Sequence, residues 1–89
     1  MSRELIQQHL IEWISETGRF NAPYGILDSK SADGKYRSVT FGIARITDIE
    51  VRIYSPSWFL IRDSRHGDQK CSSLTEVKAT LSETYGLTH

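Results

Sequence analysis

Three runs rich in β-forming residues follow one another along this chain of 89 residues, and only short connections separate them. They cover Tyr36–Ile46, Ile49–Tyr54 and Trp58–Asp63. Connections this short join antiparallel neighbours, because a parallel crossover needs a dozen residues or more. The sequence therefore predicts an antiparallel meander, with turns at Thr47-Asp48 and Ser55-Pro56-Ser57.

Apolar periodicity predicts a helix on either side of these strands. The first helix is expected over Ser2–Thr17, with Gly18 ending it. The second begins at Ser73, which has the spacing of a capping box with Glu76, and ends before Gly86. The apolar stripes are Ile6, Leu10, Trp13 and Ile14 in the first helix and Leu74, Val77, Leu81 and Tyr85 in the second.

These elements predict an α+β fold, with residues 1–89 forming one small domain. We expect a three- or four-stranded antiparallel meander sheet with one N-terminal and one C-terminal helix, in the order α-β-β-β-(β)-α. The fourth strand is Tyr24–Lys30, for which a long loop is the alternative. The polar segment Ser64–Ser72 is expected to be an exposed loop.

The two faces of the predicted sheet differ in character if Thr47-Asp48 is a two-residue turn. One face is aliphatic and suits a packed helix, because Ile46 then lies opposite Ile49. The other face is too apolar for plain solvent-facing surface and too charged for core. Its aromatic and arginine side chains are Arg37, Phe41, Arg45, Arg52, Tyr54 and Trp58.

Aromatic and arginine side chains dominate the binding energy of protein interfaces. We therefore expect these six residues to bind a protein partner, and we interpret the chain as a small non-catalytic regulator or inhibitor. Two other interpretations stay open. The second helix covers this face, with the arginines at its rim, or the face binds nucleic acid by stacking and phosphate contacts. A homodimer through the same face is also left open.

The charge balance bears on the nucleic-acid alternative. Eleven basic residues balance eleven acidic ones, giving a formal net charge of +0, whereas a strongly basic nucleic-acid binder has an excess of Lys and Arg. The order of elements is similar to that of double-stranded-RNA-binding domains. However, the second helix begins with Ser72-Ser73-Leu74-Thr75-Glu76, where those domains carry lysines, so the resemblance does not extend to function.

Cys71 is the only cysteine, so no intrachain disulfide forms and a reducing, cytoplasmic location is expected. With His66 it suggests a second alternative, a thiol or metal site. Zinc needs three or four converging ligands, so neither a metal site, a cofactor nor enzyme activity is expected. The chain lacks an apolar run of the ~20 residues that span a membrane, so no membrane partner is expected.

Overall fold

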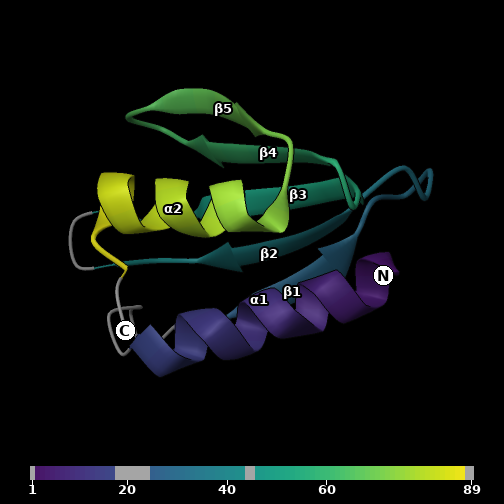
Figure 1. Cartoon of the computed structure of the whole chain (residues 1–89), viewed down its shortest axis with the longest axis horizontal. Coiled ribbons are helices and arrows are strands. Elements are labelled where there is room, and N and C mark those ends of the chain that lie inside the picture. The colour runs from purple at the N-terminus through teal and green to yellow at the C-terminus, as the bar shows by residue number, and fades with distance from the viewer. Residues whose placement is uncertain (1, 18–24, 44–45, 88–89) are drawn as a thin grey trace.

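A computed structural model describes residues 2–17, 25–43 and 46–87 of the chain (Figure 1). Within these residues the chain forms two helices and a five-stranded antiparallel sheet with strand order β1-β2-β3-β4-β5. The elements are α1 (Arg3–Thr17), β1 (Leu27–Lys30), β2 (Arg37–Phe41), β3 (Ile49–Ser55), β4 (Trp58–Asp63), β5 (Gly67–Cys71) and α2 (Leu74–Tyr85).

The predicted α+β class, the antiparallel meander and the helix at each end are confirmed, but the sheet has five strands rather than three or four. The strand expected over Tyr24–Lys30 exists as β1. The segment Ser64–Ser72, expected to be a loop, contains the fifth strand, β5. Its residues are polar and mostly exposed, so they lack the apolar alternation by which a strand is recognised. Pairing with β4 across a tight turn, with Gly67 at a φ of +68°, holds this segment in the sheet.

The register of β2 differs from the predicted one. Phe41 lies opposite Ile49, and not opposite Tyr54 as a two-residue turn at Thr47-Asp48 requires. The strand ends at Phe41, and a longer connection leads to Ile49. A register shift by an odd number of residues moves every side chain of a strand to the other face. Val39 and Phe41 therefore point into the core, where the short turn would have placed them outside.

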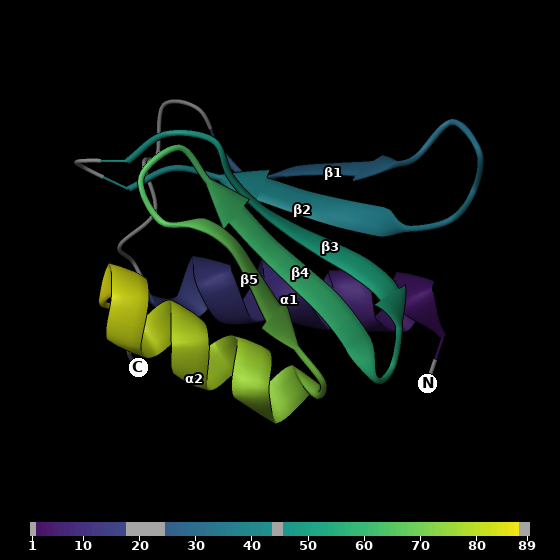
Figure 2. The same ribbon diagram turned by 90° about the horizontal axis from the view of Figure 1, so that it is seen from above.

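Both helices cover the same face of the sheet (Figure 2). They bury Ile6, Leu10 and Ile14 of α1 and Val77, Leu81 and Tyr85 of α2. The sheet contributes the alternating side chains of its inner face, among them Val39, Phe41, Ile49, Val51, Ile53, Phe59 and Ile61. The interpretation in which the second helix covers the aromatic face is therefore wrong, because α2 packs beside α1.

The ends of the helices follow the local signals in the sequence. Ser2 Oγ accepts the Leu5 N–H at 3.2 Å, and Ser73 Oγ accepts the Glu76 N–H at 3.1 Å. Glu76 reaches back to the backbone of Ser72, one residue beyond the partner of a standard capping box. Gly86 ends α2 at a φ of +72°. Gly18 lies outside the described residues.

Gln7 connects α1 to the edge of the sheet by hydrogen bonds. Its amide is buried, and Nε2 donates to the carbonyl oxygens of Ser29 at 3.0 Å and Ser38 at 2.9 Å. Its Oε1 accepts from Arg37 Nη1 at 3.1 Å. A buried amide with all these partners satisfied holds β1 and β2 in place beneath the helix.

Two leucines of α1 provide a matched test of this packing. Leu10 is fully buried, whereas Leu5 is 61% exposed. We expect Leu10→Ala to lower the free energy of unfolding by about 2–5 kcal/mol, and Leu5→Ala to change it by less than about 0.5 kcal/mol. Urea denaturation of both variants measures the difference. Equal losses would contradict the placement of α1.

Candidate functional site

The candidate site is the open face of the sheet, by which we mean the face opposite the two helices. Strand alternation places on it Tyr36 next to β2, Glu50, Arg52 and Tyr54 of β3, Trp58, Leu60 and Arg62 of β4, and Asp68 and Lys70 of β5. None of the described helices lies over it (Figure 2). Among the described elements, the neighbouring strands therefore supply the contacts that hold the large side chains of this face.

Three aromatic rings form a continuous row at one end of this face. The ring centroids of Tyr36 and Tyr54 are 5.2 Å apart, and those of Tyr54 and Trp58 are 5.4 Å apart with a 25° interplanar angle. Tyr54 lies at an irregularity between Ile53 and Ser55, where β3 has one residue more than β4. Such a bulge re-aims a side chain, and here it brings the tyrosine ring over Trp58. We call Tyr36, Tyr54 and Trp58 the aromatic row.

Cations lie against the aromatic row from both sides. The Arg52 guanidinium is 4.5 Å from the centroid of the Tyr36 ring, and Lys70 Nζ is 5.5 Å from that of Trp58. Arg52 Nη1 also donates to Tyr54 Oη at 3.5 Å. This hydrogen bond, followed by that to Glu50, outweighs burial and raises the pKa of Arg52. The guanidinium is therefore a fixed positive charge within the row.

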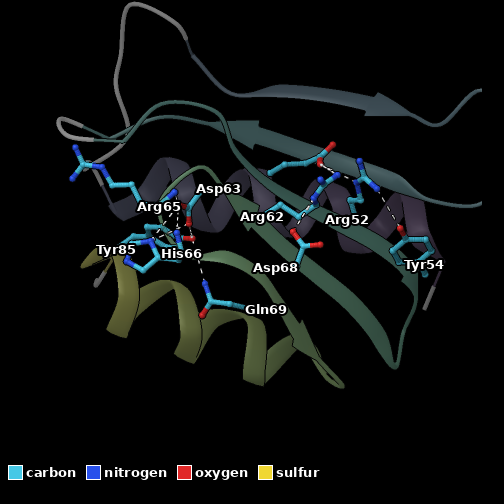
Figure 3. Close-up of polar contacts among 10 residues, drawn as sticks. Arg52, Tyr54, Arg62, Asp63, Arg65, His66, Asp68, Gln69 and Tyr85 are labelled. Carbon is cyan, nitrogen blue, oxygen red and sulfur yellow. Dashed lines mark hydrogen bonds and ion pairs between the residues drawn. The ribbon is translucent and has the colours of Figure 1, made fainter.

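A row of alternating charges crosses the open face, and Figure 3 shows its members Arg62 and Asp68 near Arg52 and Tyr54. Glu50 of β3 lies opposite Arg62 of β4, which lies opposite Asp68 of β5. Arg62 Nε donates to Asp68 Oδ1 at 3.0 Å, and Arg52 Nε donates to Glu50 Oε1 at 2.8 Å. We call Glu50, Arg62 and Asp68 the charge row. At such partly exposed sites ion pairs contribute little to stability, so their main effect is to orient the side chains.

The structure brings together three of the six residues that the sequence placed in the site. Arg52, Tyr54 and Trp58 adjoin one another on the open face. The placement of Phe41 there was wrong, because this side chain is 2% exposed and belongs to the core. Arg37 was also misplaced, since it faces α1.

Arg37 connects the first helix, α1, to β2. Its Nη2 lies 3.1 Å from Glu4 Oε1, and its Nη1 donates to Gln7. Both Arg37 and Phe41 changed faces with the register of β2. The remaining predicted residue, Arg45, lies outside the described part of the chain.

Sequence reasoning missed Tyr36 and Lys70. Tyr36 lies an even number of residues from Ser38 and Thr40, so its side chain is on the same face of the sheet. The correct register of β2 would therefore have placed it beside Tyr54. Lys70 belongs to β5, whose polar sequence carries no periodic signal. No sequence pattern could have placed this lysine near Trp58.

A second polar cluster lies where the β4–β5 turn meets the end of α2 (Figure 3). The carboxylate of Asp63 is inaccessible to solvent. It accepts the backbone N–H groups of Arg65 at 2.6 Å and His66 at 2.8 Å, and the hydroxyl of Tyr85. His66 Nδ1 lies 3.1 Å from Asp63 Oδ2, and Gln69 Nε2 donates to Tyr85 Oη at 3.4 Å. We call this group the turn anchor, because it ties the hairpin to α2.

The turn anchor shifts two acidic groups in opposite directions. Burial opposes ionisation of Asp63, but the hydrogen bonds from Tyr85, His66 and Arg65 outweigh it and lower its pKa to about 2. Burial, together with the neighbouring carboxylate, raises the pKa of Tyr85. The cluster therefore holds an ionised Asp63 and a neutral Tyr85.

The thiol or metal alternative at Cys71 and His66 is not supported by the arrangement of β5. His66 lies in the turn before this strand and Cys71 at its far end, so about five residues of extended chain, or roughly 16 Å, separate them. Cys71 is buried against Thr80, and burial raises the pKa of its thiol. No group of three metal-ligating side chains occurs among residues 2–17, 25–43 and 46–87.

A cavity of about 350 Å³ opens beside β1 and β2. Its described lining is Gly25, Leu27, Thr40, Phe41, Gly42, Thr47 and Asp48. Asp48 is the sole titratable side chain of this lining, so these residues do not form an acid–base pair.

Comparison of the chain with protein-family models, with curated proteins and with solved structures finds no match. Neither of the helices in the described part of the chain has the length and apolar character that crossing a membrane requires. The open face must therefore be interpreted from its own geometry.

Acid titration of stability tests the turn anchor. The pKa of Asp63 is lowered from 3.8 to about 2 on folding, so its ionised form stabilises the fold above pH 3.8. We expect the free energy of unfolding to fall as the pH drops from about 4 toward about 2. Asp63→Asn should cost on the order of 2 kcal/mol at pH 7 and flatten this slope.

Asp28→Asn is the matched control, because Asp28 is exposed on β1. It should change neither the stability at neutral pH nor the slope. If Asp63→Asn were as stable as this control, the carboxylate of Asp63 would not stabilise the β4–β5 turn. Urea denaturation at several pH values provides both measurements.

Proposed function

We propose that this protein is a non-catalytic binding domain, a small regulator or inhibitor that contacts a partner protein through the open face. The observation that carries the proposal is the aromatic row, which neither helix covers. Trp58 is 39% exposed, and the Tyr36 and Tyr54 rings adjoining it are partly exposed. Aromatic side chains ordered before binding lose little conformational freedom when a partner covers them.

The composition of this surface suits a protein partner. Trp, Tyr and Arg are the residues that most often dominate the energy of protein interfaces. Here Arg52 contacts both tyrosines, through the ring of Tyr36 and the hydroxyl of Tyr54, and Leu60 continues the apolar surface along β4. A partner that covers this surface would remove a Trp, two Tyr rings and a leucine from water together.

The charges of the open face favour protein over nucleic acid. Glu50 lies between Arg52 and Arg62 and pairs with both, and Asp68 pairs with Arg62. A phosphate backbone would have to displace or approach these carboxylates, whereas nucleic-acid surfaces concentrate positive charge. The formal net charge of +0 adds no long-range attraction for a polyanion.

The proposal includes a non-catalytic role and a cytoplasmic location. The titratable groups of the charge row are engaged in pairs, which suits recognition better than proton transfer. Cys71 is reduced and buried, which is compatible with a reducing compartment.

Capture experiments with matched variants test the proposal. Wild-type protein and Trp58→Ala are immobilised, exposed to lysate of the natural host at moderate salt, and the retained proteins are identified. We expect one stoichiometric partner that Trp58→Ala fails to retain, and an affinity for the purified partner at least about tenfold weaker for this variant. Circular dichroism must show that the variant keeps its helices.

Leu5→Ala serves as the control, because Leu5 is an exposed apolar side chain on α1, away from the open face. This variant should retain the partner fully. Equal loss of the partner in both variants, or none in either, would overturn the proposal. Retention of nucleic acid that elutes as salt rises would favour the nucleic-acid alternative instead.

A further inference from the structure

The strand β5 forms one edge of the sheet, and no element of the described chain lies beyond it (Figure 1). Gly67, Asp68 and Lys70 of this strand are exposed. An edge strand presents unpaired backbone N–H and C=O groups, which is a template for pairing with another strand. Proteins usually protect such edges with charged side chains, proline, bulges or a covering segment, so the charges of β5 decide which second strand can pair with this edge.

The sequence of β5 is self-complementary in charge. It reads Gly67-Asp68-Gln69-Lys70-Cys71, with an acidic and a basic residue placed symmetrically about Gln69. When two copies pair antiparallel about a twofold axis at Gln69, Asp68 of each copy lies opposite Lys70 of the other. An isologous contact repeats each pair twice, and opposite charges directly across two strands stabilise the pairing.

The charge row continues across such a contact. Within one chain it runs Glu50, Arg62 and Asp68, alternating in sign from β3 to β5. The next position in line would be Lys70 of the second copy, which keeps the alternation. All these side chains belong to the open face, so the contact does not require either helix to move.

At the opposite edge of the sheet, formed by β1, pairing with a second copy would not continue a row of alternating charges. β1 also contains an acidic and a basic residue two positions apart, Asp28 and Lys30. Both lie on the face that carries the helices, and Lys30 lies opposite Arg37, a residue of like charge. A second copy added at β1 would therefore extend no alternating row, which distinguishes β5 from it.

We propose that a second copy of this chain pairs with β5, so that the two sheets join into one continuous sheet across a twofold axis at Gln69. The proposal does not rest on the proposed function. The pairing uses the backbone edge of β5 with Asp68 and Lys70, whereas partner binding uses the aromatic row. The two surfaces adjoin at Lys70, which lies 5.5 Å from the Trp58 ring.

Charge exchange tests the pairing and its register. Sedimentation equilibrium at low salt, carried up to millimolar concentration, measures the dimer dissociation constant. We expect the wild type to dimerise, and Lys70→Asp and Asp68→Lys each to weaken the dimer at least about tenfold, because each variant puts like charges opposite one another twice. The double variant D68K/K70D restores opposite charges between the two copies and should dimerise more tightly than either single variant, although it loses the ion pair between Arg62 and Asp68 within each chain. Lys30→Asp on β1 is the matched control and should dimerise as the wild type does.

Mixing the two single variants keeps the test independent of small losses in stability. The chain with Lys70→Asp carries two acidic residues on β5, and the chain with Asp68→Lys carries two basic ones. The mixture should therefore form a heterodimer, although each variant by itself stays largely monomeric. Thermal melting confirms that each variant is folded. A wild type that stays monomeric throughout, a double variant that fails to dimerise, or equal effects of Lys30→Asp and Lys70→Asp would overturn the proposal.

Discussion

One-sided burial is the constraint on which the rest of this structure depends. The central strand β3 sends Ile49, Val51 and Ile53 to the inner face, and these side chains are completely buried. Both helices must lie over that face, because only there do the strands offer an apolar surface to their stripes. Neither of the described helices covers the opposite face, and its aromatic row stays partly exposed.

Two buried polar groups complement this apolar layer at the sides of the sheet. Gln7 of α1 hydrogen-bonds the carbonyl groups of β1 and β2, and Asp63 joins the β4–β5 turn to Tyr85 of α2. A buried polar group lowers the free energy of unfolding unless its hydrogen-bond partners are present. Gln7 and Asp63 therefore each favour a single position of their helix relative to the sheet. Gln7 and Asp63 therefore fix the two edge regions of the sheet relative to the helices.

The open face combines two properties. Its aromatic row is preordered by stacking and by Arg52, which lowers the entropic cost of binding. Its charge row is neutralised together with Arg52, which pairs with Glu50, and it ends at the exposed strand β5. The first property supports the proposed binding of a partner protein, and the second supports the proposed pairing of two copies at β5.

Local signals in the sequence determined the helices, their caps, and the alternation of β3 and β4, because each depends on neighbours within a few residues. Arg52, Tyr54 and Trp58 could therefore be assigned to one surface beforehand. The face occupied by Arg37 and Phe41 could not, since it depends on the length of the connection from residue 42 to residue 48, and one residue more or less exchanges the faces of β2. The strand β5 exists only through its pairing with β4 and its anchorage to α2. Tertiary structure alone decided these features, because their stabilising contacts come from residues distant in the chain.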